Sequence, residues 1–201
     1  MCDKKLFLGW KGYWEAVNGQ LGNDNQYTLA FGFSSKVAEV PFLAVKQNGN
    51  VPEGEDGEPA IVGMYPPPGW NNLGAPSIKD ARNLAFKAGC GWKKGEAAGV
   101  HAEVLLIRAW MNSIGGSDKK KQFDAIASIG DSIYISASQP ACWCCAALMD
   151  SMGIHYDKWT AGSKPITGWR HPLSNKTIPN SNLPKHQSSI NKKFLADAVD
   201  F

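Results

Sequence analysis

The stretch IYISASQPACWCCAALMDSMGIHYDKW, residues 133–159, decides the fold class that the sequence predicts. Ile133–Ala137 has the β-branched and aromatic residues of a strand, and a short polar turn follows it. Ala141–Met152 is almost wholly apolar, which favours a buried helix that stops at Gly153. Ile154–Trp159 then favours a second strand. These elements predict a βαβ unit with parallel strands and a right-handed crossover.

Further strands and helices are indicated on both sides of this unit. Tyr27–Ser34 and Val40–Gln47 are rich in β-branched and aromatic residues and predict neighbouring strands, and Ala60–Tyr65 predicts a third. Val104–Met111 is apolar except for Arg108, which predicts a helix buried nearly all round. The fold class is therefore α/β, with a mixed sheet of about five strands.

Four other segments have local patterns of their own. Ser77–Gly89 has a capping box and an apolar face, which favours a helix. The triple lysine Lys119–Lys121 is typical of a polar turn, and Phe123–Ile129 is either a short helix or a connecting turn. Lys185–Phe201 ends with a helical pattern.

Composition is that of an ordinary globular chain of 201 residues with a formal net charge of +3. We expect a single domain, 1–201, with a core at about 27–160, an aromatic N-terminal segment 1–26 and a basic C-terminal extension 161–201. No stretch approaches the roughly 18 apolar residues of a membrane span, and the first residues lack the apolar run of a signal peptide. A cytoplasmic protein with no membrane partner is therefore expected.

Three of the five cysteines lie within four residues, which suits metal binding better than a disulfide framework. His101, Cys142 and Cys145 supply one nitrogen and two sulfur ligands, the set of a catalytic zinc site with one open position. The CxxC spacing brings two sulfurs to one metal when it opens a helix. A Cys142 and Cys144 pair is the alternative register, although the two side chains would point to opposite sides of a helix.

Glu103 is two residues from His101, where it can accept a proton from a metal-activated water and pass it on. Residues two apart on a helix point away from each other, so the pair converges only at the first turn. We therefore expect the helix to start at Val100 or His101.

His101-Ala102-Glu103, followed by Pro140 and the pair Cys142 and Cys145, resembles the H-x-E and P-C-x-x-C signature of the cytidine deaminase-like superfamily. The resemblance covers about residues 77–160. It implies a three-layer α-β-α fold with the metal-binding helices packed on the sheet. It also implies a Zn²⁺ cofactor held by His101, Cys142 and Cys145, with Glu103 as the catalytic proton shuttle. The chain departs from the pattern at Ala141, which separates the proline from the first cysteine.

The long gap between the motifs and the turn at Ala141 look most like bacterial toxin-type deaminases that act on DNA. This likeness implies conversion of cytosine to uracil in DNA, single- or double-stranded, and an immunity protein as a partner if the chain is a delivered toxin domain. No particular oligomeric state is indicated. The alternatives are a free cytidine or deoxycytidine deaminase, a tRNA adenosine deaminase, and a non-enzymatic zinc-stabilised binding module.

Substrate contacts are predicted from residue type and from proximity to the two motifs. Trp143 and Trp70 can stack a base, and Lys93 and Lys94 can reach a phosphate. Residues 155–201 carry seven Lys or Arg against three Asp, which is also compatible with phosphate contacts. The full set of predicted substrate-binding residues is Trp70, Asn71, Asn72, Lys93, Lys94, Ala102, Ser138 and Trp143.

Overall fold

The computed structural model describes residues 27–37, 42–47, 60–64, 101–137, 139–156, 169–174, 176 and 178–200. The aromatic segment 1–26 and the helix predicted at Ser77–Gly89 lie outside the described residues. Among the described residues, no helix combines the length and the apolar character needed to cross a membrane.

A five-stranded sheet forms the centre of the described chain, in the order β3-β2-β1-β4-β5. β1 pairs antiparallel with β2 and with β4, and β2 pairs antiparallel with β3, while β4 and β5 are parallel. The mixed α/β architecture expected from the sequence is therefore confirmed, and the three-layer arrangement stays a prediction. The strands are β1 (Tyr27–Phe33), β2 (Phe42–Gln47), β3 (Ala60–Met64), β4 (Tyr134–Ala137) and β5 (His155–Tyr156).

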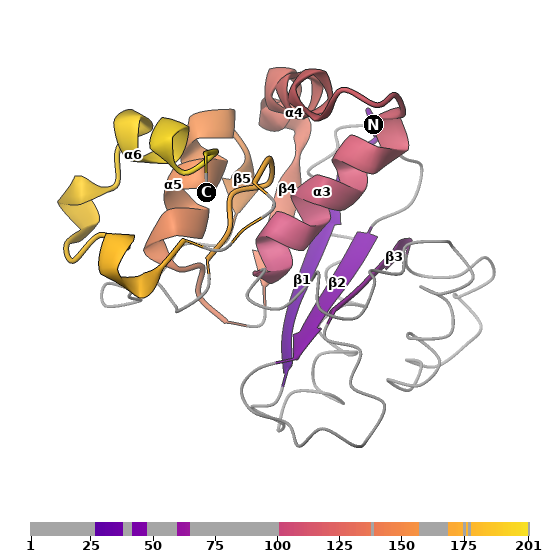
Figure 1. Ribbon diagram of the computed structural model, residues 1–201. Coiled ribbons are helices and arrows are strands. Elements are labelled where there is room, and N and C mark those ends of the chain that lie inside the picture. Colours follow the sequence, from indigo (N-terminus) through magenta and orange to yellow (C-terminus); the bar gives the residue numbers. More distant parts are fainter. Residues whose placement is uncertain are drawn as a thin grey trace.

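Helix α3 (Ala102–Ile114) packs across this sheet and contacts β1, β2, β3 and β4 (Figure 1). Small residues allow the close approach, because Ala30 on β1 and Ala44 on β2 are fully buried and face each other in the strand register. A Cβ atom on Gly32 would lie 2.6 Å from a ring carbon of Trp110. Glycine at this position therefore leaves room for the Trp110 indole against β1.

The buried character predicted for α3 is confirmed. Every residue from Ala102 to Met111 is buried, including Arg108, which is 7% exposed. The helix is thus enclosed by other elements for most of its length, and Arg108 must find its hydrogen-bond partners inside the protein.

Helix α4 (Lys119–Ser128) corrects the expectation of a polar turn at Lys119–Lys121. The side chain of Asp118 caps the helix by accepting hydrogen bonds from the backbone N–H groups of Lys120 and Lys121. Gln122 and Ile126, four residues apart, form its buried face. The lysines are therefore the exposed first turn of an amphipathic helix.

The predicted βαβ unit consists of β4, α5 (Trp143–Met152) and β5, and residues 157–159 of the second predicted strand lie outside the described residues. Gly153 ends α5 in the left-handed conformation, with φ at 70°. In Figure 1, α5 lies beside β4 and β5, at the end of the sheet away from β3. The loop from β4 to α5 leaves the carboxyl end of a strand, where ligands of open α/β sheets collect.

The C-terminal region closes over this end of the molecule. Helix α6 (Lys192–Asp197) follows short 3₁₀ turns at Asn180–Asn182 and Gln187–Ser189, and a further 3₁₀ turn at Gly130–Ser132 precedes β4. Leu195 and Ala198 are buried in the core. The helical pattern predicted near the C-terminus is therefore present.

Candidate metal centre

Two helix N-termini meet at the candidate site. His101 is the N-cap of α3, where its carbonyl accepts the first helical hydrogen bond from Leu105 at 3.0 Å. Cys142 holds the same place on α5, with Ala146 as the donor at 2.9 Å. Both residues have extended backbone conformations, so their side chains are free to turn towards each other at the helix ends. α3 begins one residue later than the latest start that the sequence indicated.

The ligand atoms of His101, Cys142 and Cys145 all lie within 4.8 Å of one another, and all three residues are buried. His101 Nδ1 is 3.4 Å from the sulfur of Cys142 and 3.4 Å from the sulfur of Cys145. In a tetrahedral zinc site with Zn–N of about 2.0 Å and Zn–S of about 2.3 Å, the nitrogen and each sulfur would be about 3.6 Å apart. Both cysteines are free thiols. The donor set and its spacing therefore fit a zinc ion.

Cys144 stands outside this cluster although it lies between the two sulfur ligands in sequence. Its side chain is fully buried in the core. Hydrogen bonds from the thiols of Cys144 and Cys145 hold the pKa of Cys142 well below its ordinary value. Of the two registers open from the sequence, the Cys142 and Cys145 pair is the one that converges on His101.

Glu103 occupies the first turn of α3 and is 4% exposed. Burial raises the pKa of its carboxyl group, and the charge of His101 and, to a smaller extent, a hydrogen bond from the Cys145 thiol partly offset this effect. That hydrogen bond places the carboxyl group beside the metal-ligand cluster. His101 and Glu103 thus both lie at the start of α3, which is where the sequence required them to be if their side chains are to converge.

The imidazole of His101 faces the two sulfurs with Nδ1, and its Nε2 is buried with no hydrogen-bond partner among the described residues. A metal-ligating histidine usually donates its second ring N–H to a neighbour. Among the described residues, the hydrogen-bond contacts of the His101 side chain are therefore those of Nδ1 to the two sulfurs.

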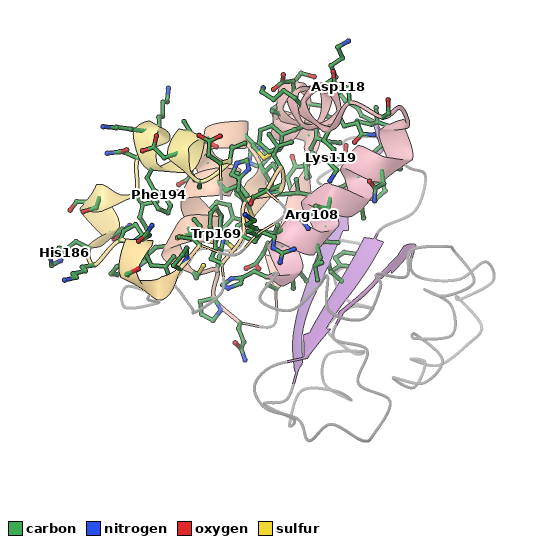
Figure 2. The ribbon with its side chains drawn as sticks, viewed as in Figure 1. Arg108, Asp118, Lys119, Trp169, His186 and Phe194 are labelled. Atoms are coloured by element: carbon green, nitrogen blue, oxygen red, sulfur yellow. The ribbon has the colours of Figure 1, made fainter. Side chains whose placement is uncertain are left out.

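Sequence reasoning missed the contacts of two buried residues, Trp169 and Arg108, both labelled in Figure 2. The indole Nε1–H of Trp169 donates to the sulfur of Cys145 at 3.3 Å. Arg108 donates from Nε to the carbonyl of Pro172 at 3.0 Å, and from Nη2 to the carbonyls of His171 and Ser174. The sequence marks Arg108 as the one charged residue in the apolar stretch Val104–Met111, and it places Trp169 in the polar-aromatic run Trp169-Arg170-His171-Pro172, but neither pattern identifies a partner.

His171 is buried and is not part of the metal-ligand cluster. Its Nδ1 accepts a hydrogen bond from the backbone N–H of Leu173 at 3.2 Å. Burial, with smaller contributions from the charges of Arg108 and Lys120, lowers the pKa of His171 to about 4. The side chain is therefore a neutral core residue near neutral pH.

Two of the predicted substrate-binding residues belong to the described part of the chain. Ala102 is the buried first residue of α3, and Trp143 is the half-buried first residue of α5. The indole N–H of Trp143 is buried with no hydrogen-bond partner among the described residues. The remaining predicted contacts, Trp70, Asn71, Asn72, Lys93, Lys94 and Ser138, lie outside the described residues.

Comparison with protein families gives a match between residues 100–173 and the OTT_1508-like deaminase family. Neither the curated proteins nor the solved structures gave a match. The matched stretch begins one residue before His101 and runs past Cys145 to Leu173, so it contains the whole metal-ligand cluster. Over residues 100–173 the chain is therefore similar to a deaminase family of the cytidine deaminase-like superfamily.

Proposed function

We propose that this protein is a zinc-dependent hydrolytic deaminase that converts cytosine to uracil in DNA. The observation that carries the proposal is the buried cluster of one imidazole nitrogen and two thiols, with a buried carboxyl group hydrogen-bonded to one of those thiols. The family match over residues 100–173 supports deamination as the reaction class. The choice of cytosine as the base and of DNA as the substrate rests on the likeness of the motifs and on charge.

Each residue of the cluster has a separate task in the proposed reaction. His101, Cys142 and Cys145 would hold zinc, which supplies a Lewis acid that activates water near neutral pH. Glu103 takes a proton from the attacking water and delivers it to the departing amino group. A C–O bond forms at C4 of cytosine, the C4–N bond breaks, and ammonia leaves with the net consumption of one water.

The raised pKa of Glu103 suits this proton-carrier task. Burial favours the protonated form of the carboxyl group, so a proton taken up during attack is held until the leaving group needs it. The same enclosure excludes bulk water from the reacting atoms. A solvent-exposed carboxylate at this position would release the proton to water instead.

Two features favour a polynucleotide over a free nucleoside. The side chains of Lys185, Lys192 and Lys193 are exposed in the basic C-terminal region, where they can meet phosphates. The half-buried Trp143 indole adjoins the ligand Cys142 and offers an aromatic face to an extruded base. Extrusion costs a few kcal/mol, which stacking on an aromatic side chain offsets.

A panel of substrates tests the proposal. It presents cytosine and adenine as free nucleosides, in single-stranded DNA, in duplex DNA and in single-stranded RNA. Products are identified by mass. We expect uracil in DNA and no product from free cytidine. Product from free cytidine alone would assign a nucleoside deaminase, and inosine in RNA would assign an adenosine editor.

Two cysteine variants separate catalysis from folding. Cys145→Ala removes a proposed ligand, and Cys144→Ala removes a buried thiol of the same size outside the cluster. We expect Cys145→Ala to lose both bound zinc and activity, and Cys144→Ala, which keeps all three ligands and loses one hydrogen bond to Cys142, to bind zinc more weakly and remain active. A protein that binds zinc through four protein ligands and deaminates nothing would instead be a zinc-stabilised binding module.

A further inference from the structure

The hydrogen bond from Trp169 to Cys145 joins a buried indole to a proposed metal ligand. The distance from Nε1 to Sγ is 3.3 Å, and both side chains are fully buried. A buried indole N–H normally finds an acceptor, and backbone carbonyls are the common choice. Here the acceptor is a sulfur, which is a weak acceptor as a thiol and a stronger one when it carries charge.

Several contacts hold the Trp169 indole in this position. The backbone carbonyl of Trp169 accepts a hydrogen bond from the N–H of Ile178 at 2.9 Å, which closes the loop between them. The ring of Phe194 on α6 lies 6.2 Å from the indole, centroid to centroid, with the planes tilted by 34°. The indole therefore has little freedom to turn its N–H elsewhere.

The same loop is tied to α3, the helix that begins at the other ligand, His101. Arg108 donates hydrogen bonds to the carbonyls of His171, Pro172 and Ser174, immediately after Trp169. Figure 2 shows Arg108 on α3 and Trp169 against α5. One loop thus connects the helix that carries the nitrogen ligand to a sulfur ligand on the neighbouring helix.

We propose that Trp169 is a positioning residue of the metal centre, whose indole N–H orients the sulfur of Cys145 for metal binding. The inference rests on the proposed metal site and goes beyond the ligand set. Hydrogen bonds to ligand atoms from outside the ligand set fix ligand direction and tune the metal, and their loss costs about 10- to 100-fold in metal affinity. A donor to a coordinating sulfur also withdraws electron density from it.

The first test compares Trp169→Phe, which keeps an aromatic ring and removes the N–H, with Trp110→Phe. Trp110 is equally buried but packs against β1 at Gly32, so its replacement is a control for loss of an indole from the core. Zinc affinity is measured by chelator competition, and the thiolate-to-metal charge-transfer band is recorded with Co²⁺. We expect Trp169→Phe to weaken zinc binding about tenfold and to move the band to lower energy, with neither change in Trp110→Phe.

A measurement on the unaltered protein covers the case in which Trp169→Phe does not fold. With an NMR-active cadmium isotope in the site, a scalar coupling through the hydrogen bond is expected between the metal and the indole proton of Trp169. Absence of that coupling, or unchanged affinity and band in a folded Trp169→Phe, would overturn the role of Trp169 while leaving the metal site standing. A wild-type protein that binds neither zinc nor cobalt would overturn the metal site and this inference together.

Discussion

Replacement of Arg108 by methionine tests how the C-terminal loop is attached to the metal-binding helices. Methionine keeps most of the apolar length of the side chain and removes the guanidinium group. Arg108 is 7% exposed, and its hydrogen bonds go to the backbone carbonyls of His171, Pro172 and Ser174, which all lie in buried residues. Arg108→Met leaves those three carbonyls without this donor inside the protein.

The size of the effect follows from these contacts. A hydrogen bond to a charged group contributes about 1.5–3 kcal/mol, and removal of one member of a buried charged contact costs about 3–5 kcal/mol. We expect the free energy of unfolding to fall by about 3–5 kcal/mol, which corresponds to a decrease in Tm of roughly 10 °C for a chain of this size. Because the loop carries Trp169, zinc affinity should fall as well.

Urea unfolding of the zinc-loaded protein, followed by circular dichroism, measures the change. Lys120→Met is the matched control, since Lys120 is an exposed cation on α4 whose ion pair with Asp124 contributes about 0–1 kcal/mol. An Arg108→Met protein as stable as the Lys120→Met protein, with unchanged zinc affinity, would refute the role given to these hydrogen bonds.

Three further predictions concern single sites. Glu103→Ala should retain zinc and lose deamination by at least about 10²-fold, and full turnover in a product assay would remove the proton-carrier role. Gly130→Ala should lower the free energy of unfolding by about 2 kcal/mol or more, because its Cβ would lie 1.7 Å from the backbone oxygen of Met152; wild-type stability in urea would contradict this. His171 has its pKa lowered from 6.5 to about 4 by burial, so the folded protein binds this proton less tightly than the unfolded chain. The neutral His171 side chain therefore makes its full contribution to the free energy of unfolding above about pH 6.5, and this contribution falls by up to about 3 kcal/mol as the pH falls towards 4. His171→Gln should make the free energy of unfolding less dependent on pH over this range. An unchanged pH dependence in that variant would exclude His171 as its source.

The metal-ligand cluster was predictable because its signals are local in the sequence. His101 and Glu103 lie two residues apart, and the CxxC spacing places Cys142 and Cys145 one helical turn apart. Each motif opens an apolar segment, so the two helix starts could be placed to within one or two residues. The choice of Cys145 over Cys144 also followed from helix geometry, because residues 142 and 144 would point to opposite sides of a helix, and the structure confirms it.

Contacts between distant segments could not be predicted in the same way. The bond from Trp169 to Cys145 spans 24 residues, and those from Arg108 to the loop after Trp169 span more than 60. No periodicity marks either pair. The first turn of α4 was missed for a different reason: three consecutive lysines suggested a solvated turn, and Phe123–Ile129 was left open between a helix and a turn. The Asp118 cap and the four-residue spacing of Gln122 and Ile126 specify an amphipathic helix.

The most direct test of the account is ammonia release from a cytosine-containing DNA oligonucleotide by chelator-treated protein as zinc is returned. We expect no release without metal, and recovery that is complete at one zinc per chain and absent in Cys145→Ala. Undiminished release by the metal-free protein, or a disulfide between Cys142 and Cys145 in the active protein, would contradict a site in which one imidazole and two sulfurs hold the metal.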